Sequence, residues 1–317
     1  MKEPTFLTRA TSDGRERRMP VGIIHGARPG ERLTVFAGQH GTEYAGIEAA
    51  MRLYRELDPA DVRGTVVVVM ATHEESLNDW IQFAPTHPEI RDMMKEAATG
   101  SQYIINCHGG EFTEGMHPYV ICRFISDAQA DATAMRMSEA FGAGIISLSR
   151  YRGEPPPDPS GARAAWWLWP NKGLCDELQI PEITPEVGEK GDRDDTIMYN
   201  GILNVLRELD FLDEEAHPVA APKIIGDRWW LTGDGPGVFF PEVEVGQMVV
   251  AGQRLGIVRD YFGEILQTVT APQDACVMNL NVGMPAKKDG FLVWIGTLDG
   301  SPPEGVDWTP KAEARKA

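Results

Sequence analysis

The stretch LTVFAGQHGTEYAGIEAAMRLYREL, residues 33–57, indicates the fold class of this chain. It begins with a short apolar run ending in glycine, as a buried strand does, and continues into a helical segment. Similar runs and segments alternate over the first two-thirds of the sequence, which predicts a sheet covered by helices on both faces. The expected strands are residues 33–38, 65–71, 103–110 and 117–126, and the expected helices are residues 43–57, 89–98, 128–142 and 197–212.

The composition changes after residue 213. Residues 214–223 (EEAHPVAAPK) resemble a linker, and short β-rich segments broken by Gly, Pro and Asp follow them without a helix of useful length. Several short strands at close spacing with turn signals predict a small all-β module. We therefore expect an α/β domain at 1–213, a β-rich domain at 223–300 and a loose tail at 301–317.

Part of the β-rich segment, EVEVGQMVVAGQRLGIV at 242–258, resembles the half-barrel of lipoyl and biotinyl domains. Those carriers present a lysine at a hairpin tip, usually between methionines. Lys287 and Lys288 follow Pro285 without that context. A carrier or interaction module is therefore the less favoured of the functions that the sequence allows.

Charge and composition limit the kinds of partner that this chain is expected to bind. The 317 residues include 30 Lys and Arg against 47 Asp and Glu, a net charge of −17. Such a surface repels phosphate backbones and anionic lipid, so we expect neither nucleic acid nor membrane as a partner. The N-terminal residues lack an apolar signal region, and the longest apolar run, 66–71, is far shorter than a membrane span. Four scattered cysteines without a CxxC pair suggest neither a zinc knuckle nor a disulfide framework. A cytoplasmic protein is the expectation.

The sharpest functional signal is GQHGTEYAG, residues 38–46, at the end of the first predicted strand. The C-terminal end of a strand in an α/β sheet opens into the usual ligand crevice. His40 and Glu43, three positions apart at a turn entering a helix, can converge on one metal ion, since Gly41 and Thr42 let the backbone bend tightly. A surface helix start would explain the same residues nearly as well.

A second signal is NCHGG, residues 106–110, where His108 follows an apolar strand. A single histidine there is more often a core or surface residue than a ligand. His40, Glu43 and His108 nevertheless all stand at predicted C-terminal strand edges. Two histidines and a glutamate with an open fourth position are typical of catalytic zinc, because three protein ligands leave room for water.

A third signal is IPEITPEVGEKG, residues 180–191, another short apolar strand that ends in an acidic residue and then glycine. A metal-activated water needs a nearby carboxylate to take its proton and pass it to the leaving nitrogen. Glu186 is our candidate for that role, with Glu182 and Glu189 as competitors. On spacing alone, an exposed acid at a strand end explains Glu186 equally well.

Taken in order, HGTEYAG, CHGG, ITPEVGEKG, NGILNVLRELDFL and the β-rich C-terminal part resemble the succinylglutamate desuccinylase/aspartoacylase family, zinc-dependent relatives of the carboxypeptidases. The similarity covers roughly residues 20 to 300. It implies a carboxypeptidase-like mixed sheet flanked by helices, followed by a small all-β, half-barrel-like domain that limits substrate size at the pocket mouth.

The same resemblance implies roles for individual residues. His40 and Glu43 match the family's GxHGxE zinc ligands, and His108 matches the third ligand, with Asn106 where the family's D-x-H motif has an acid. Glu186 falls on the general acid/base of the T-x-E-x-G motif. The implied cofactor is one Zn²⁺ per chain.

The sequence departs from the family after the second predicted strand. Members carry an Asn-Arg pair followed by Phe-Pro-Gly, and the pair grips a substrate carboxylate, but the stretch THEESLNDWIQFAPTHPEIRD at 72–92 contains neither. An arginine binds a carboxylate through two hydrogen bonds that no neutral residue replaces. His73, Glu74, Glu75 and Asn78 now stand at this strand end, and we expect His73 and Asn78 to contact substrate, although a surface-loop role for His73 is an equal alternative.

Two further features offer selectivity. Arg123 lies inside an apolar run, VICRF, which is costly unless the charge is paired or functional. We name it as a candidate substrate anchor, with an ion pair to an acidic neighbour as the commoner explanation. A proline-rich loop and three tryptophans at 150–170 offer an aromatic pocket wall or, more commonly, core contacts.

The sequence thus predicts a zinc-dependent hydrolase of an amide bond in a small N-acyl compound, acting through metal-activated water and Glu186. An esterase and a non-catalytic zinc- or ligand-binding homologue are the alternatives. The expected partners are a small-molecule substrate and further copies of the same chain.

Overall fold

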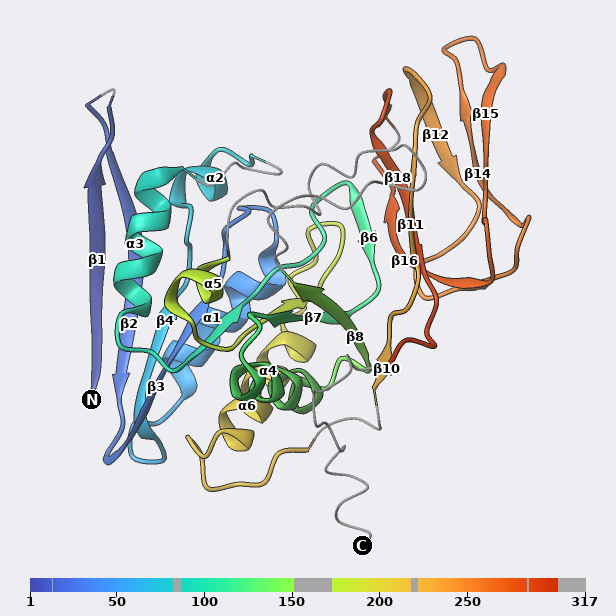
Figure 1. Ribbon diagram of the computed structural model, residues 1–317. Coiled ribbons are helices and arrows are strands. Elements are labelled where there is room, and N and C mark those ends of the chain that lie inside the picture. Colours follow the sequence, from blue (N-terminus) through green and yellow to red (C-terminus); the bar gives the residue numbers. More distant parts are fainter. Residues whose placement is uncertain (13, 82–86, 151–172, 218–221, 284, 302–317) are drawn as a thin grey trace, which may run out of the picture.

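A computed structural model gives the fold of residues 1–12, 14–81, 87–150, 173–217, 222–283 and 285–301. Its largest element is a mixed sheet of nine strands (Figure 1). In spatial order these strands are β1 (Lys2–Ala10), β2 (Glu16–His25), β4 (Arg63–Val69), β3 (Arg28–Phe36), β5 (Tyr103–Asn106), β9 (Glu182–Glu186), β7 (Tyr119–Phe124), β8 (Ile145–Arg150) and β10 (Lys223–Ile224). Strands β4, β3, β5 and β9 run parallel, so their C-terminal ends meet at one edge.

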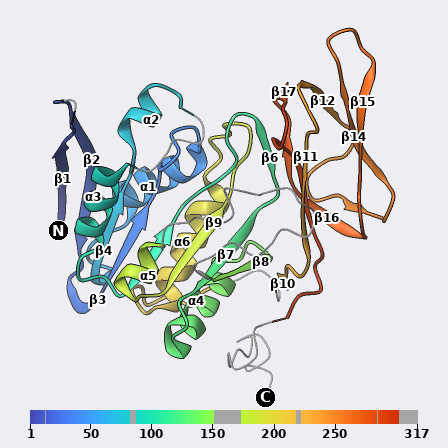
Figure 2. The same cartoon turned by 45° about the horizontal axis from the view of Figure 1, so that its top comes forward.

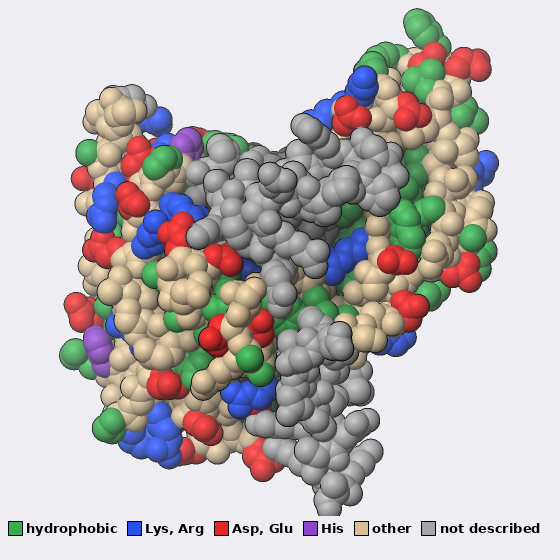
Figure 3. All heavy atoms as spheres, in the orientation of Figure 1, with side chains coloured by type: hydrophobic (Ala, Val, Ile, Leu, Met, Phe, Trp, Pro, Cys, Tyr) green, Lys and Arg blue, Asp and Glu red, His purple; other side chains and the backbone are tan. Residues whose placement is uncertain are grey.

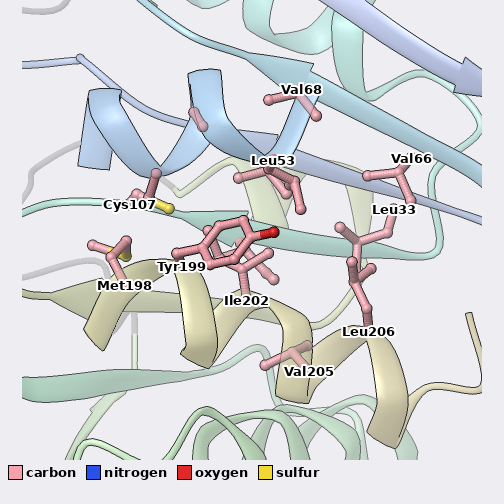
Figure 4. Packing of buried hydrophobic residues seen from close by; sticks show 14 of the residues in the cluster. Leu33, Leu53, Val66, Val68, Cys107, Met198, Tyr199, Ile202, Val205 and Leu206 are labelled. Carbon is pink, nitrogen blue, oxygen red and sulfur yellow. The ribbon is translucent and has the colours of Figure 1, made fainter. Parts of the chain in front are cut away.

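Helices cover both faces of this sheet, as the sequence predicts. One face packs against α1 (Tyr44–Glu56), α4 (Ala128–Phe141) and α6 (Thr196–Glu208), and the other against α3 (Pro88–Ala98) and α5 (Leu174–Leu178). The run of four valines in β4 shows why both faces are apolar: Val66 and Val68 join the α1/α6 core, and Val67 and Val69 join the α3 core. Figure 4 shows the first of these cores, with Leu53 of α1 and Ile202 of α6 packed against strand residues.

The C-terminal strands form two smaller sheets that pack against each other (Figure 2). The first contains β11 (Arg228–Thr232), β18 (Phe291–Gly296), β16 (Ala275–Asn281) and β13 (Met248–Val249), with β6 (Glu114–Met116) paired to β16. The second contains β15 (Ile265–Thr270), β14 (Arg254–Arg259), β12 (Gly237–Pro241) and β17 (Pro285–Ala286). No helix occurs among the described residues of this part, in agreement with the predicted all-β module.

Two strands and an apolar cluster connect the two parts. Strand β10 comes after the linker at 214–223 yet pairs with β8 of the large sheet, and β6 comes from the first part yet pairs with β16. Around them Tyr119 of β7 packs on Trp294 of β18, with ring centroids 5.1 Å apart. The C-terminal sheets are therefore anchored directly beside the strands that carry the candidate site. The predicted tail lies outside the described residues from 302 onward.

Some predicted element ends are wrong. The strand expected at 103–110 ends at Asn106, and the helix expected at 197–212 ends at Glu208. After Asn106 the chain passes against the neighbouring backbone so closely that a Cβ at Gly109 would lie 2.2 Å from the carbonyl oxygen of Val187. His108 consequently stands just beyond β5, where its side chain is not committed to a sheet face.

In the described part of the chain, no helix has both the length and the apolar character that crossing a bilayer would require.

Candidate metal centre

The loop between β3 and α1 places His40 and Glu43 at the C-terminal edge of the large sheet. Glycine is required in this loop, because a Cβ at Gly41 would lie 2.2 Å from the backbone nitrogen of Leu77 in α2 (Glu74–Asn78). The backbone N–H of Gly41 donates a hydrogen bond to Ser76 Oγ at 2.9 Å. The loop is thus held against α2, and this contact fixes the direction in which His40 and Glu43 point.

The next parallel strands supply His108 and Glu186 on the same edge. The backbone N–H of His108 donates to the carbonyl oxygen of Pro185 at 2.9 Å, and the N–H of Val187 donates to the carbonyl oxygen of His108 at 3.0 Å. These bonds form a parallel bridge that sets His108 beside Glu186. Two residues that are 78 positions apart therefore have a fixed register across the gap between β5 and β9.

The structure brings His40, Glu43 and His108 together. One donor atom from each lies within 4.8 Å of the other two, a group that could hold a metal ion. Glu43 sits between the histidines, with Oε1 at 2.6 Å from Nδ1 of His40 and Oε2 at 3.2 Å from Nδ1 of His108. Glu43 Oε2 is buried and makes no hydrogen bond beyond its contact with His108 Nδ1. A buried carboxylate is costly unless it is paired or coordinates a metal, and this one lies between two imidazoles, a donor set that fits a cation.

Electrostatics favour a charged cluster even without a cation. Burial alone would lower the pKa of His40, but the carboxylates of Glu43, Glu111 and Glu114 raise it to about 9. Burial would raise the pKa of Glu43, yet the charges of His40 and His108 hold it below its usual range. Because a histidine binds metal through a deprotonated nitrogen, metal binding here would displace a proton from His40.

Two further acids lie at this centre that the sequence analysis missed. Glu111 is fully buried, accepts a hydrogen bond from Thr42 Oγ1 at 2.9 Å and has Oε1 at 3.7 Å from Nδ1 of His40. Glu114 accepts a hydrogen bond from the N–H of Glu111 at 3.3 Å, and burial raises its pKa to about 7. Both follow His108 in the run HGGEFTEG, which was the available signal, but their burial depends on β6 pairing with β16.

The three candidates for the acid/base differ in whether their side chains already have a partner. Glu182 forms an ion pair with Arg123, and Glu189 forms one with Lys190. The side chain of Glu186, in contrast, forms no hydrogen bond or ion pair with a described residue, although its backbone pairs with Tyr119 of β7. Burial, followed by the charges of Glu43 and Glu114, raises the pKa of Glu186 well above its ordinary value.

Arg123 shows the ion pair that the sequence left open as the commoner explanation. Its Nε lies 3.3 Å from Glu182 Oε1 and donates a hydrogen bond to Thr184 Oγ1 at 3.1 Å.

Two other features from the sequence have different outcomes. Asn106, which stands where the D-x-H motif of the resembled family has an acid, is buried and its Oδ1 has no hydrogen-bond partner. The proline-rich loop and tryptophans expected to shape selectivity fall at 151–172, outside the described residues.

His73 and Asn78 line a cavity of about 230 Å³ at the end of β4. Its other lining residues are Glu16, Arg17, Arg18, Thr72, Glu74, Glu75 and Ile90. Burial, followed by His87, lowers the pKa of His73 to about 4, so its ring is neutral near pH 7, and its Nε2 has no hydrogen-bond partner. Arg17 is already occupied by Glu75 at 3.3 Å and Glu89 at 2.8 Å. The cavity therefore offers a neutral imidazole where the resembled family has the arginine of its Asn-Arg pair.

Comparisons with known proteins match part of this chain to a catalytic domain and nearly the whole of it to a known fold. The model of the succinylglutamate desuccinylase/aspartoacylase catalytic domain matches residues 29–93, which include His40 and Glu43. Proteins of the kind that this family is named for are hydrolases. A search of curated proteins gave no match.

Solved structures align over nearly the whole chain. The product-bound ectoine utilization protein EutE (DoeB) from Ruegeria pomeroyi has a TM-score of 0.78 at 18% identity, covering 93% of this chain and 95% of its own. A succinylglutamate desuccinylase from Silicibacter sp. TM1040 has a TM-score of 0.78 at 18% identity, covering 94% and 95%. A succinylglutamate desuccinylase/aspartoacylase from Rhodobacter sphaeroides has a TM-score of 0.78 at 15% identity, covering 95% and 96%.

These similarities confirm the resemblance and the fold class predicted from the sequence: residues 29–93 match the succinylglutamate desuccinylase/aspartoacylase catalytic domain, and the chain as a whole has the fold of structures named for that family.

Proposed function

We propose that this chain is a zinc-dependent hydrolase that cleaves an amide bond in a small N-acyl compound. The observation that carries the proposal is the convergence of His40, Glu43 and His108, with Glu186 bridged to His108 through the backbone. Three protein ligands leave a coordination position open, as catalytic rather than structural zinc sites do. One Zn²⁺ per chain is the proposed cofactor.

The residues have separable tasks in this proposal. Bound zinc would supply Lewis-acid chemistry, polarising a carbonyl and lowering the pKa of water. Glu186 would accept a proton from the attacking water and deliver it to the departing amine. A carboxyl group whose pKa burial raises above its ordinary value suits both steps, because it is a stronger base than an ordinary glutamate and, once protonated, can donate the proton to the departing amine.

Substrate selection would rest on neutral contacts. Arg17 and Arg18 of the cavity and Arg123 of β7 all have carboxylate partners, so none presents an unpaired guanidinium to a ligand. His73 and Asn78, in the cavity at the end of β4, remain our proposed substrate contacts. Arg123 would join them only by leaving Glu182.

Localisation in the cytoplasm belongs to the same proposal. All four cysteines, Cys107, Cys122, Cys175 and Cys276, are free and buried, which suits a reducing compartment. A small molecule is the proposed partner at the metal centre, and the net charge of −17 disfavours nucleic acid and anionic membranes.

The test is metal analysis of the purified chain combined with a screen of N-acyl amides and matched esters. We expect about one zinc per chain, amide hydrolysis that a chelator abolishes, and recovery when zinc is restored. Full zinc without turnover of any amide or ester would identify a non-catalytic homologue. Turnover of esters alone would identify an esterase, and absence of bound metal would refute the proposal.

A further inference from the structure

The hairpin of β14 and β15 carries an exposed apolar surface far from the metal centre. Tyr261 and Phe262 at its turn are 76% and 94% exposed, and Ile265 and Leu266 at the start of β15 are 53% and 55% exposed. Figure 3 shows hydrophobic side chains at the outer end of the projection that the C-terminal strands form. We call these four residues the hairpin patch.

Strand β15 is also the unpaired end of its sheet. The order of that sheet is β15-β14-β12-β17, so one side of β15 presents backbone N–H and C=O groups to which no described strand is paired. Its six residues, ILQTVT, include no charge and no proline. Such an edge is a ready template for another strand, and natural proteins usually protect it.

The other sheet ends of this protein are protected. Strand β1, at the opposite end of the molecule (Figure 1), carries Lys2, Glu3, Pro4 and Arg9. Strands β10, β13 and β17 have two residues each, too short to template pairing. All five residues of β11 are half-buried, and its Thr232 carbonyl accepts a hydrogen bond from the Gln267 side chain. The contrast indicates that β15 is left unprotected because something covers it.

The size and charge of the surface indicate what covers it. At ~200 Å² per large side chain, the hairpin patch exposes roughly 550 Å² of apolar surface, about two-thirds of the ~800 Å² that each partner buries in a standard interface, and the backbone edge of β15 adds to it. The chain has a net charge of −17, so two copies repel each other over most of their surfaces, but β15 itself is uncharged. An edge strand is self-complementary under a two-fold axis, because antiparallel pairing presents the same groups from both sides.

We propose that β15 and the hairpin patch form the interface of a homodimer in which the two β15 strands pair antiparallel. With Gln267 opposite Gln267 of the second copy, opposed side chains share a face of the sheet, Glu264 lies opposite Thr270, and the acidic ends do not meet. Two four-stranded sheets then join into one continuous sheet of eight. The interface lies in the C-terminal part and uses no residue of the metal centre, so the dimer and the proposed hydrolysis stand or fall separately.

The experiment is sedimentation equilibrium of the full chain, compared with two matched variants. Ile265→Lys places a charge in the interface twice, whereas Ile197→Lys changes an isoleucine of similar exposure, 47%, on α6. We expect the unaltered chain to be a dimer, Ile265→Lys to raise the dimer dissociation constant at least ~10-fold, and Ile197→Lys to leave it unchanged. Zinc content and thermal unfolding of each variant confirm that it is folded.

Hydrogen–deuterium exchange then locates the contact. We expect the backbone amides of β15 to become protected as the concentration rises, while those of β1 do not change. A monomer at every concentration, or a dimer that Ile265→Lys weakens no more than Ile197→Lys, would overturn the proposal. Protection of β15 that is independent of concentration would also overturn it, because the cover would then come from the same chain.

Discussion

Buried polar groups are distributed very differently over the two parts of this molecule. Among the described residues after 222, the buried polar side chains are Asn279 and Thr297, and no charged side chain is buried. At the edge of the nine-stranded sheet, in contrast, Glu43, Glu111 and Glu114 are buried together with His108. The interior of the described C-terminal sheets is therefore almost wholly apolar, as that of a supporting structure is.

The difference shows where buried charged groups lower the stability of this fold. Burying a carboxylate costs free energy unless the charge is paired, hydrogen-bonded or bound to a cation. The metal-site edge accepts that cost several times over, and the apolar cluster around Tyr119 and Trp294 fixes the strands beside it. Strand β6 belongs to both regions, because it carries Glu114 into the site while it pairs with β16 of the C-terminal sheets. Perturbed acids gathered at one place are typical of functional sites.

The largest expected effect comes from removing a metal donor. We expect His108→Ala to lose most of the zinc and nearly all hydrolysis, because the two protein ligands that remain are too few to hold the ion. Elemental analysis and activity are the measurements. His117→Ala, at a histidine that contributes no donor to the cluster, is the control and should keep its metal. A His108→Ala protein with full zinc would refute the ligand assignment.

The next largest effect separates chemistry from metal binding. We expect Glu186→Gln to keep zinc yet lower turnover by at least ~10²-fold, the usual scale for a positioned acid/base. Glu189→Gln is the matched control, since Glu189 already pairs with Lys190 and should retain most of its turnover. Near-normal turnover in Glu186→Gln would move the role to another acid or end the mechanism.

The comparison also explains how far sequence reasoning reached. Local patterns were sufficient where one segment determines the outcome: the four valines of β4 indicate a strand covered on both faces, and GQHGTE indicates a turn between a strand and a helix. His108 and Glu186 were candidates because each stands at the end of an apolar strand, and the family resemblance then implied their roles. Their proximity follows from parallel pairing, which brings strand ends to one edge.

Sequence reasoning failed where burial depends on distant partners. Glu111 and Glu114 look like surface acids, but Glu111 contacts Thr42 and His40, about 70 positions earlier, and β6, which carries Glu114, pairs with β16 about 165 positions later. The hairpin of β1 and β2 was missed because its outer strand is half-exposed and charged, which leaves few apolar residues to notice. Strand edges and domain contacts of this kind have no local signature.

A smaller effect tests the cost of the buried acids directly. The pKa of Glu114 is about 7 against an ordinary value of 4.5, so the folded state binds its proton more tightly than the unfolded state does. Stability from this group is therefore complete below about pH 4.5 and is lost as pH rises through 7. We expect Glu114→Gln to stabilise the metal-free protein by about 3 kcal/mol at pH 8 and hardly at all at pH 4.

Thermal unfolding of both proteins at the two pH values measures this difference. Val277→Thr, a polar change at a fully buried position of the C-terminal core, is the contrasting control. It should destabilise by about 1–3 kcal/mol at both pH values, because its hydroxyl is buried without titrating. A Glu114→Gln gain that does not depend on pH would show that the carboxyl is not the cause.

The smallest expected effect concerns the α-carboxylate of the substrate. The rates of hydrolysis of an N-acyl acid and of its matched amide should have a ratio close to one. Because Arg17 and Arg123 are both engaged with carboxylates, binding should depend little on a free α-carboxylate in the substrate. We expect amidated or esterified N-acyl compounds to be hydrolysed at least comparably to free N-acetylaspartate or succinylglutamate, since apolar and neutral contacts would select the substrate in place of a bidentate arginine. Kinetics on matched acid and amide pairs decide the question, with Arg193→Ala, a change at an exposed arginine, as the control.

Arg123 is the residue most able to contradict this prediction, because release from Glu182 would leave its guanidinium free to bind a carboxylate. A strong preference for the acid that disappears in Arg123→Ala but persists in Arg193→Ala would show that the clamp has moved to β7, and the neutral-contact account of selectivity would be wrong.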